Sequence, residues 1–140
     1  LCRDLSEIAN YANVDNVQFK QLKAHTPAPI TFILNATKDV PKKLAHPKKK
    51  TIGIRVPSNP IAQALLEAMD EPILTSSLIL PNRDDILDDP FEIEDLLGNQ
   101  IDGLINAGIK TTKLTTIVDM TSSRPEVIRQ GAADVDSLLL

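Results

Sequence analysis

The sequence predicts a layered α/β or α+β sheet domain, and three observations support this prediction. Short aliphatic runs typical of strands alternate along the chain with stretches whose apolar residues recur at helical spacing. Prolines and capping residues separate these stretches. The chain has 140 residues, 42% of them hydrophobic, which suits one ordinary core. We therefore predict a single domain over residues 1–140, with its strands and helices in layers.

Helices are expected where a capping residue or a proline precedes an amphipathic stretch. Asp4 or Ser6 caps the first helix, and Ser58 caps the third, with Pro60 in its first turn. The second helix is expected to place Val17, Phe19 and Leu22 on one face. The expected helices run from Glu7 to Tyr11, from Asp15 to near His25, from Ile61 to Met69 and from Asp89-Pro90 through Leu97, with helical turns at 39–46 and 135–140.

Strands are expected where aliphatic and β-branched residues run between turn signals. The expected strands are Ile30 to Leu34, Thr51 to Val56, Ile73 to Leu80, Leu104-Ile105, Thr115 to Met120 and Val127 to Arg129. Because helices interleave with them, these strands predict a sheet covered by helices.

Composition excludes several classes of protein. The chain is too aliphatic to be disordered, and no apolar run approaches the roughly 20 residues of a membrane span. A single cysteine, Cys2, excludes an internal disulfide framework and favours a cytoplasmic location. With 3% aromatic residues, the chain offers no stacking platform for single-stranded nucleic acid. Because it begins at Leu1 and not at Met, we expect a C-terminal portion of a longer protein, with removal of an initiator Met as the alternative.

Charge is unevenly distributed although the net charge is only −4. Residues 16–60 hold nine lysines and arginines against one acid, whereas residues 61–104 hold eleven acids against one arginine. The basic segment predicts a surface that binds phosphates. The alternative is a solvated loop balanced by the acidic segment. The candidate RNA contacts are Lys42, Lys43, Lys48, Lys49 and Lys50.

Motifs for metal or nucleophilic chemistry are absent from the sequence. His25 and His46 are far apart and Cys2 stands alone, so we predict no metal site. No serine has a nucleophile-elbow motif, and the five glycines form neither a Walker A sequence nor a dinucleotide-binding motif. Acid pairs at 84–85 and 88–89 are typical of a solvated turn, with a Mg²⁺ site as the alternative.

Polar residues at strand ends are the remaining candidates for a site. Guanidinium groups and hydroxyls together can hold the phosphates and polar edges of a nucleotide. Each residue also has a structural interpretation, because threonine favours strands and arginine forms surface ion pairs. The candidates are Thr31, Arg55, Ser77, Thr115, Thr116 and Arg129.

Five segments, in order, resemble signatures of the YrdC/YciO family and span nearly the whole chain. Residues 26–31 resemble its proline–glycine–proline–x–threonine turn, and residues 53–60 its arginine–hydrophobic–proline segment. Residues 71–77 match its serine-bearing strand, residues 115–119 its Ser-Thr-Val-Val-Asp strand and residues 127–132 its Arg-x-Gly ending. The sequence of residues 75–80 is most similar to the YciO branch.

The resemblance implies a twisted mixed β-sheet with flanking helices and a concave, positively charged cavity. It also implies threonylcarbamoyl-adenylate synthesis from L-threonine, bicarbonate and ATP, with Mg²⁺, for tRNA modification, and affinity for double-stranded RNA or tRNA. Arg55 and Arg129 are expected to hold ATP phosphates, and Thr31 to shape the cavity. Ser77, Thr115 and Thr116 are expected to line the nucleotide pocket.

Departures from the family pattern define an alternative function. Ile79 replaces an asparagine that helps to hold the nucleotide, and Leu114 occupies the usual glutamate position. Ala28 replaces the signature glycine and Gln130 a common proline, while the N-terminal Lys/Arg motif is absent. The alternative is a nucleotide- or double-stranded-RNA-binding protein without synthase turnover. A purely structural fragment is the third hypothesis.

Overall fold

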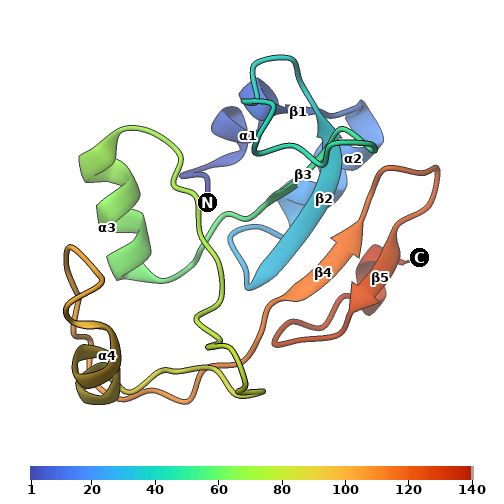
Figure 1. Ribbon diagram of the computed structural model, residues 1–140. Helices are drawn as coiled ribbons and strands as arrows, with labels where there is room; N and C mark the ends of the chain where they lie inside the picture. The colour runs from blue at the N-terminus through green and yellow to red at the C-terminus, as the bar shows by residue number, and fades with distance from the viewer. Residues whose placement is uncertain (140) are drawn as a thin grey trace. The chain divides into compact units, whose positions relative to one another are not determined.

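The computed structural model describes residues 1–139 and divides the chain into two compact units. The first unit combines residues 1–75 with the chain from Thr115 onward, and the second comprises residues 76–114. In chain order the elements are α1 (Leu5–Tyr11), β1 (Ala12–Asn13), α2 (Asn16–Ala24), β2 (Ile30–Ala36), β3 (Thr51–Ile54), α3 (Pro60–Met69), α4 (Pro90–Leu97), β4 (Thr116–Asp119), β5 (Glu126–Arg129) and a 3-10 helix η1 (Asp136–Leu138) (Figure 1). All of them except α4 belong to the first unit.

A five-stranded mixed sheet is the centre of the first unit, as predicted. Its order is β1-β2-β4-β5, and β3 also pairs with β2. β2 runs antiparallel to β1 and β3 but parallel to β4, with Thr31 opposite Ile117. β5 returns antiparallel to β4, with Arg129 opposite Ile117. The central strand β2 therefore pairs with β1, β3 and β4, and β5 joins the sheet through β4.

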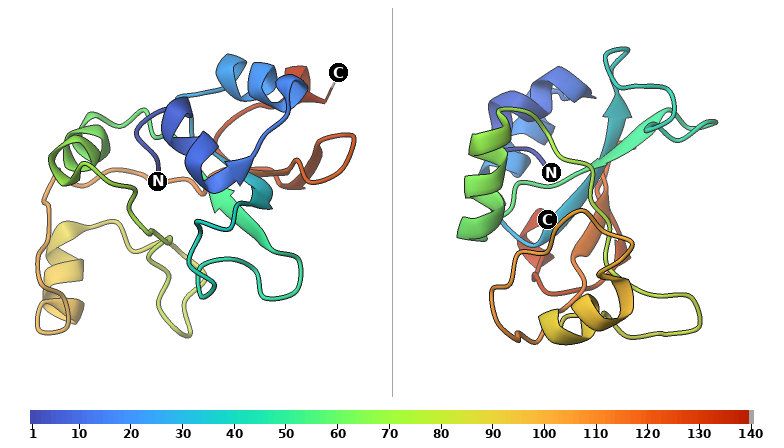
Figure 2. Two further views of the ribbon diagram at one scale, coloured as in Figure 1. Left: turned by 90° about the horizontal axis from the view of Figure 1, so that it is seen from above. Right: turned by 60° about the vertical axis from the view of Figure 1, so that its left-hand side comes forward.

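The two faces of the sheet have different surroundings. Along β2, Ile30, Phe32 and Leu34 are buried, whereas Thr31 and Ile33 are half-buried. The buried side packs into a core with side chains of α1, α2 and β4, namely Ile8, Leu22 and Val118, and with Leu138 of η1. Figure 2 shows α1, α2 and η1 on the same side of the sheet. Strand alternation places Thr31 and Ile33 on the opposite face, which no helix of the described part of this unit covers, and we call it the open face.

Local capping explains why the predicted helices form. Asp4, Asp15 and Asp89 cap α1, α2 and α4, each accepting a hydrogen bond from a backbone N–H of the first turn. For α3 the predicted cap was wrong, because Asn59 and not Ser58 accepts from the N–H groups of Ile61 and Ala62. Pro60 opens that helix as expected. Its position leaves Asn59 as the residue whose carboxamide reaches those donors.

Three expectations drawn from hydrophobic pattern are wrong. Val17 and Phe19 of α2 are 66% and 43% exposed, so they do not share the buried side of Leu22. Residues 73–80 and 104–105 form no strand. In the first of these segments, main-chain pairing with another segment of the first unit is confined to Ile73, which exchanges hydrogen bonds with Leu1. An aliphatic run becomes a strand only when a neighbour satisfies its backbone groups.

The expected C-terminal helical turn is a short 3-10 helix, η1, and Leu140 lies outside the described residues. Among residues 1–139, no helix is long and apolar enough to span a bilayer.

Candidate functional site

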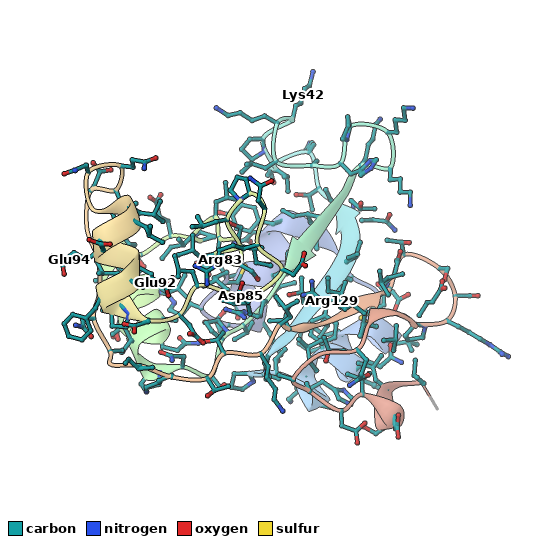
Figure 3. All side chains as sticks on the ribbon, turned by 60° about the horizontal axis from the view of Figure 1, so that its bottom comes forward. Lys42, Arg83, Asp85, Glu92, Glu94 and Arg129 are labelled. Carbon is teal, nitrogen blue, oxygen red and sulfur yellow. The ribbon has the colours of Figure 1, made fainter. Side chains whose placement is uncertain are left out.

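Three predicted site residues meet on the open face across β2, β4 and β5. The hydroxyl oxygens of Thr31 and Thr115 lie 3.1 Å apart. The Arg129 guanidinium donates from Nε and Nη2 to the Thr115 carbonyl oxygen at 3.1 and 2.9 Å, and from Nη2 to the Thr115 hydroxyl at 3.3 Å. Strand register brings them together, because Ile117 lies opposite both Thr31 and Arg129. Arg129 is thus fixed before any ligand arrives (Figure 3).

Arg55 lies just beyond β3 and has a different environment. It stands between the buried residues Ile54 and Val56, so strand alternation places it on the same face as Gly53 and Thr31. Its side chain is half-buried, and burial lowers the pKa of its guanidinium. Among residues 1–139, no acceptor or carboxylate pairs with this guanidinium. A partly desolvated cation without a partner favours binding of an anion, because hydrogen bonds to the anion would replace those that the cation lost from water.

Thr116 has a structural role in this fold. It lies opposite Ile30 on the buried side of the sheet and is fully buried. Its hydroxyl donates to the Ala133 carbonyl at 2.7 Å and accepts from the N–H groups of Gly131 and Ala133 at 3.0 and 3.1 Å. These bonds use its hydrogen-bonding capacity. We therefore leave Thr116 out of the candidate surface, although the sequence pattern includes it.

Ser77 belongs to the second unit and is exposed there. Its carbonyl accepts a hydrogen bond from the Ile79 N–H at 3.1 Å. Its nucleotide contact stays a prediction.

The lysine-rich segment 41–50, which we call the basic loop, connects β2 to β3. All five candidate lysines are exposed, and Figure 3 shows the side chain of Lys42 projecting away from the ribbon. His46 organises the loop, since its Nδ1 accepts from the N–H groups of Lys48 and Lys49 at 3.3 and 3.1 Å. Sequence reasoning missed this role, because a lone histidine carries no pattern. Within the described chain no acid pairs with these lysines, which leaves them available to phosphates.

Three of the four paired acids of the second unit have structural partners, namely Asp85, Asp88 and Asp89. Arg83 donates to Asp85 and to Glu92, and these three residues lie together in Figure 3. Asp88 accepts from the Thr112 N–H at 2.9 Å, and Asp89 caps α4. No group of three or more metal-ligating side chains occurs within residues 1–139. We therefore assign no protein ligands to Mg²⁺.

A cavity of about 420 Å³ lies beside β3. Aliphatic side chains from the basic loop, β3 and the segment after α3 make up most of its wall, including Val40, Leu44 and Leu74. Gly53 borders it, whereas the predicted nucleotide-binding residues do not. The open face and this cavity therefore adjoin at Gly53, a residue that sequence reasoning passed over.

Comparison with known proteins places this geometry in a family. A family model for Sua5, YciO and YrdC proteins, described as "Telomere recombination", matches residues 1–131. YciO of Escherichia coli (strain K12), an uncharacterized protein, is 52% identical over 139 residues, which are 99% of this chain and 68% of that protein. A putative threonylcarbamoyl-AMP synthase of Methanocaldococcus jannaschii is 29% identical over 140 residues, covering 97% of this chain and 63% of that protein.

Solved structures agree with the sequence relatives. The crystal structure of E. coli YciO superposes with a TM-score of 0.93 over 99% of this chain and 68% of that one, at 52% identity. Sua5 of P. abyssi complexed with L-threonine superposes with a TM-score of 0.86 over 97% of this chain and 40% of that one, and at 20% identity it shows the fold alone. The predicted fold and resemblance are confirmed: the chain belongs to the Sua5/YciO/YrdC family.

Proposed function

We propose that this protein binds ATP on the open face and uses L-threonine and bicarbonate to form threonylcarbamoyl-AMP and pyrophosphate. The guanidinium of Arg55 carries the proposal, because a half-buried cation that has no partner among residues 1–139 favours a phosphate ligand. Relatives named threonylcarbamoyl-AMP synthase and a family structure that holds L-threonine add support. The proposed product accounts for both a phosphate site at Arg55 and a threonine ligand in the family, because it is an adenylate of a modified threonine.

The reaction needs positioning and charge neutralisation more than a protein nucleophile. The threonine amine and bicarbonate condense to a carbamate with loss of water. A carbamate oxygen then attacks the α-phosphorus of ATP, and the bond to the departing pyrophosphate breaks. Arg55 and Arg129 would hold phosphate oxygens, while the hydroxyls of Thr31 and Thr115 offer short polar contacts. Mg²⁺ would enter with ATP as part of the substrate.

The test measures ATP affinity by calorimetry and pyrophosphate release on the full chain. Arg55→Gln should weaken ATP binding about 10- to 100-fold, the loss expected for charged hydrogen bonds. Arg124→Gln is the matched control, because Arg124 is exposed and the charge change is the same. Pyrophosphate should appear only with threonine and bicarbonate both present. Bound ATP without pyrophosphate under those conditions would refute the synthase, and equal affinity of the two variants would refute the site.

The basic loop favours a second candidate function, binding of double-stranded RNA or tRNA without turnover. Five phosphate contacts would weaken RNA binding about 500-fold between 50 and 200 mM salt. Changing Lys48, Lys49 and Lys50 to Glu should abolish binding, whereas the same change at the exposed Lys20 and Lys23 of α2 serves as the control. If RNA affinity is unchanged both at the higher salt concentration and in the loop variant, the basic loop does not bind RNA and is only a solvated surface.

A further inference from the structure

Gly53 occupies a strand position where the fold does not require glycine. It lies within β3, in unbroken antiparallel register opposite Ile33. Its φ is not in the left-handed region, so its backbone conformation is open to any residue. Glycine in the interior of a strand is destabilising relative to alanine, and it often marks a place where a ligand approaches the backbone.

Packing does not require glycine here either. Gly53 is exposed, and a Cβ built on it would meet a single neighbour, Cγ2 of Thr31, at 3.3 Å. That contact is tight but needs a shift of only a few tenths of an ångström. The backbone conformation therefore does not explain the missing side chain, and packing restricts a side chain here only through the contact with Thr31.

The surroundings of Gly53 point to a ligand. The bare backbone of Gly53 adjoins Thr31, whose hydroxyl faces Thr115, and precedes Arg55 by two residues, which strand alternation places on the same face. Gly53 also borders the cavity of about 420 Å³ beside β3, so the space next to it is not filled by protein. A group that lies on the open face at Gly53 could contact the peptide plane and, two residues further along the chain, the Arg55 guanidinium.

We infer that Gly53 admits the phosphate chain of ATP to the proposed nucleotide site by letting it lie against the β3 backbone beside Thr31 and Arg55. The inference rests on the proposed function and adds to it the residue that admits the phosphates. A side chain at position 53 would push the phosphates away from Arg55, while the sheet itself would keep its register.

The experiment compares Gly53→Ala with wild type on the full chain, measuring the Kd for ATP and the midpoint of urea unfolding. We expect the Kd to rise at least about tenfold while the unfolding midpoint stays equal or increases. Gly103→Ala is the matched control, because Gly103 is exposed and a Cβ added to it would meet nothing within 4 Å. An unchanged Kd in Gly53→Ala, with ATP bound normally by wild type, would overturn the inference alone. Failure of wild type to bind ATP would remove the proposed site and the inference together.

A second pair of variants separates ligand exclusion from displacement of Thr31. Thr31→Ser removes Cγ2, the atom that the new methyl group would touch, and keeps the hydroxyl. If the methyl group blocks ATP directly, Gly53→Ala weakens binding by the same factor in the Thr31→Ser background as in wild type. If binding returns to the level of Thr31→Ser alone, the methyl group acts by shifting Thr31, and the inference is wrong. If Gly53→Ala alone folds poorly, the double variant can be tested in its place, because it removes the contact between the new methyl group and Thr31 Cγ2.

Discussion

Replacing Thr116 by valine removes one hydroxyl that hydrogen-bonds to three main-chain groups. The hydroxyl donates to the Ala133 carbonyl and accepts from the N–H groups of Gly131 and Ala133. Thr116 is fully buried, whereas Gly131 and Ala133 are half-buried. Valine keeps the shape of the side chain and leaves the two N–H groups without their partner, whereas the Ala133 carbonyl keeps a hydrogen bond from Gln130 Nε2 at 2.8 Å.

The magnitude follows from that count of groups. A buried polar group that loses its partner costs about 1–3 kcal/mol, and water can rescue part of this loss at half-buried positions. Because two N–H groups lose their partner, we expect Thr116→Val to lower the free energy of unfolding by about 2–4 kcal/mol. Thr116→Ser keeps the hydroxyl and loses one methyl group, which should cost about 1 kcal/mol. The more hydrophobic substitution should thus be the more damaging one.

Urea unfolding followed by far-ultraviolet circular dichroism measures the difference. Hydrogen exchange should also show the amides of Gly131 and Ala133 losing protection in the valine variant. Thr51→Val, at a half-buried threonine of β3, is the control and should change stability by less than about 0.5 kcal/mol. If Thr116→Val is as stable as Thr116→Ser, the hydroxyl is not what holds the C-terminal segment to β4.

Three further predictions test individual groups. Asn59→Ala should destabilise the protein by about 1 kcal/mol and Ser58→Ala by far less, because only Asn59 caps α3; equal urea midpoints would contradict this. Burial raises the pKa of the Cys2 thiol from 9.0 to about 11, so iodoacetamide at pH 8 should alkylate the folded protein about 100-fold more slowly than the urea-unfolded chain. This raised pKa stabilises the fold below about pH 9, and the stabilisation is lost as the pH rises toward 11. Urea unfolding midpoints measured across this pH range should show the loss. His46→Ala should speed hydrogen exchange at the Lys49 amide, whose acceptor it removes.

The helices were predictable because their signals are local. Asp4, Asp15 and Asp89 each satisfy donors within the following turn, so neighbouring residues suffice to place those helices. Strands depend on distant partners. The aliphatic run at 73–80 resembles β2 in composition, yet β2 has neighbouring strands along both edges and the run at 73–80 has none among the described residues. Composition cannot distinguish the run that forms a strand from the run that does not, since strand pairing is a property of the whole fold.

The candidate site was predictable as a set of residue types but not as an arrangement. Thr115 and Thr116 are identical neighbours in the sequence, yet one faces Thr31 and Arg129 while the other is buried under the C-terminal segment. A shift of one residue in strand register would exchange their roles. Register therefore decides which hydroxyl can reach a ligand.

The two arginines should contribute to binding in different ways. Arg129 already donates three hydrogen bonds to Thr115, so a ligand gains a fixed cation at little further cost in side-chain entropy. Arg55 is partly desolvated and unpaired within the described chain, so an anion there restores interactions that folding removed. Arg55 should therefore contribute most to the affinity for ATP, and Arg129 should mainly orient the bound ATP. Accordingly, neutralising Arg55 should mainly raise the Kd for ATP, whereas replacing Arg129 by lysine, which cannot reproduce the paired Nε and Nη2 donors, should mainly lower turnover.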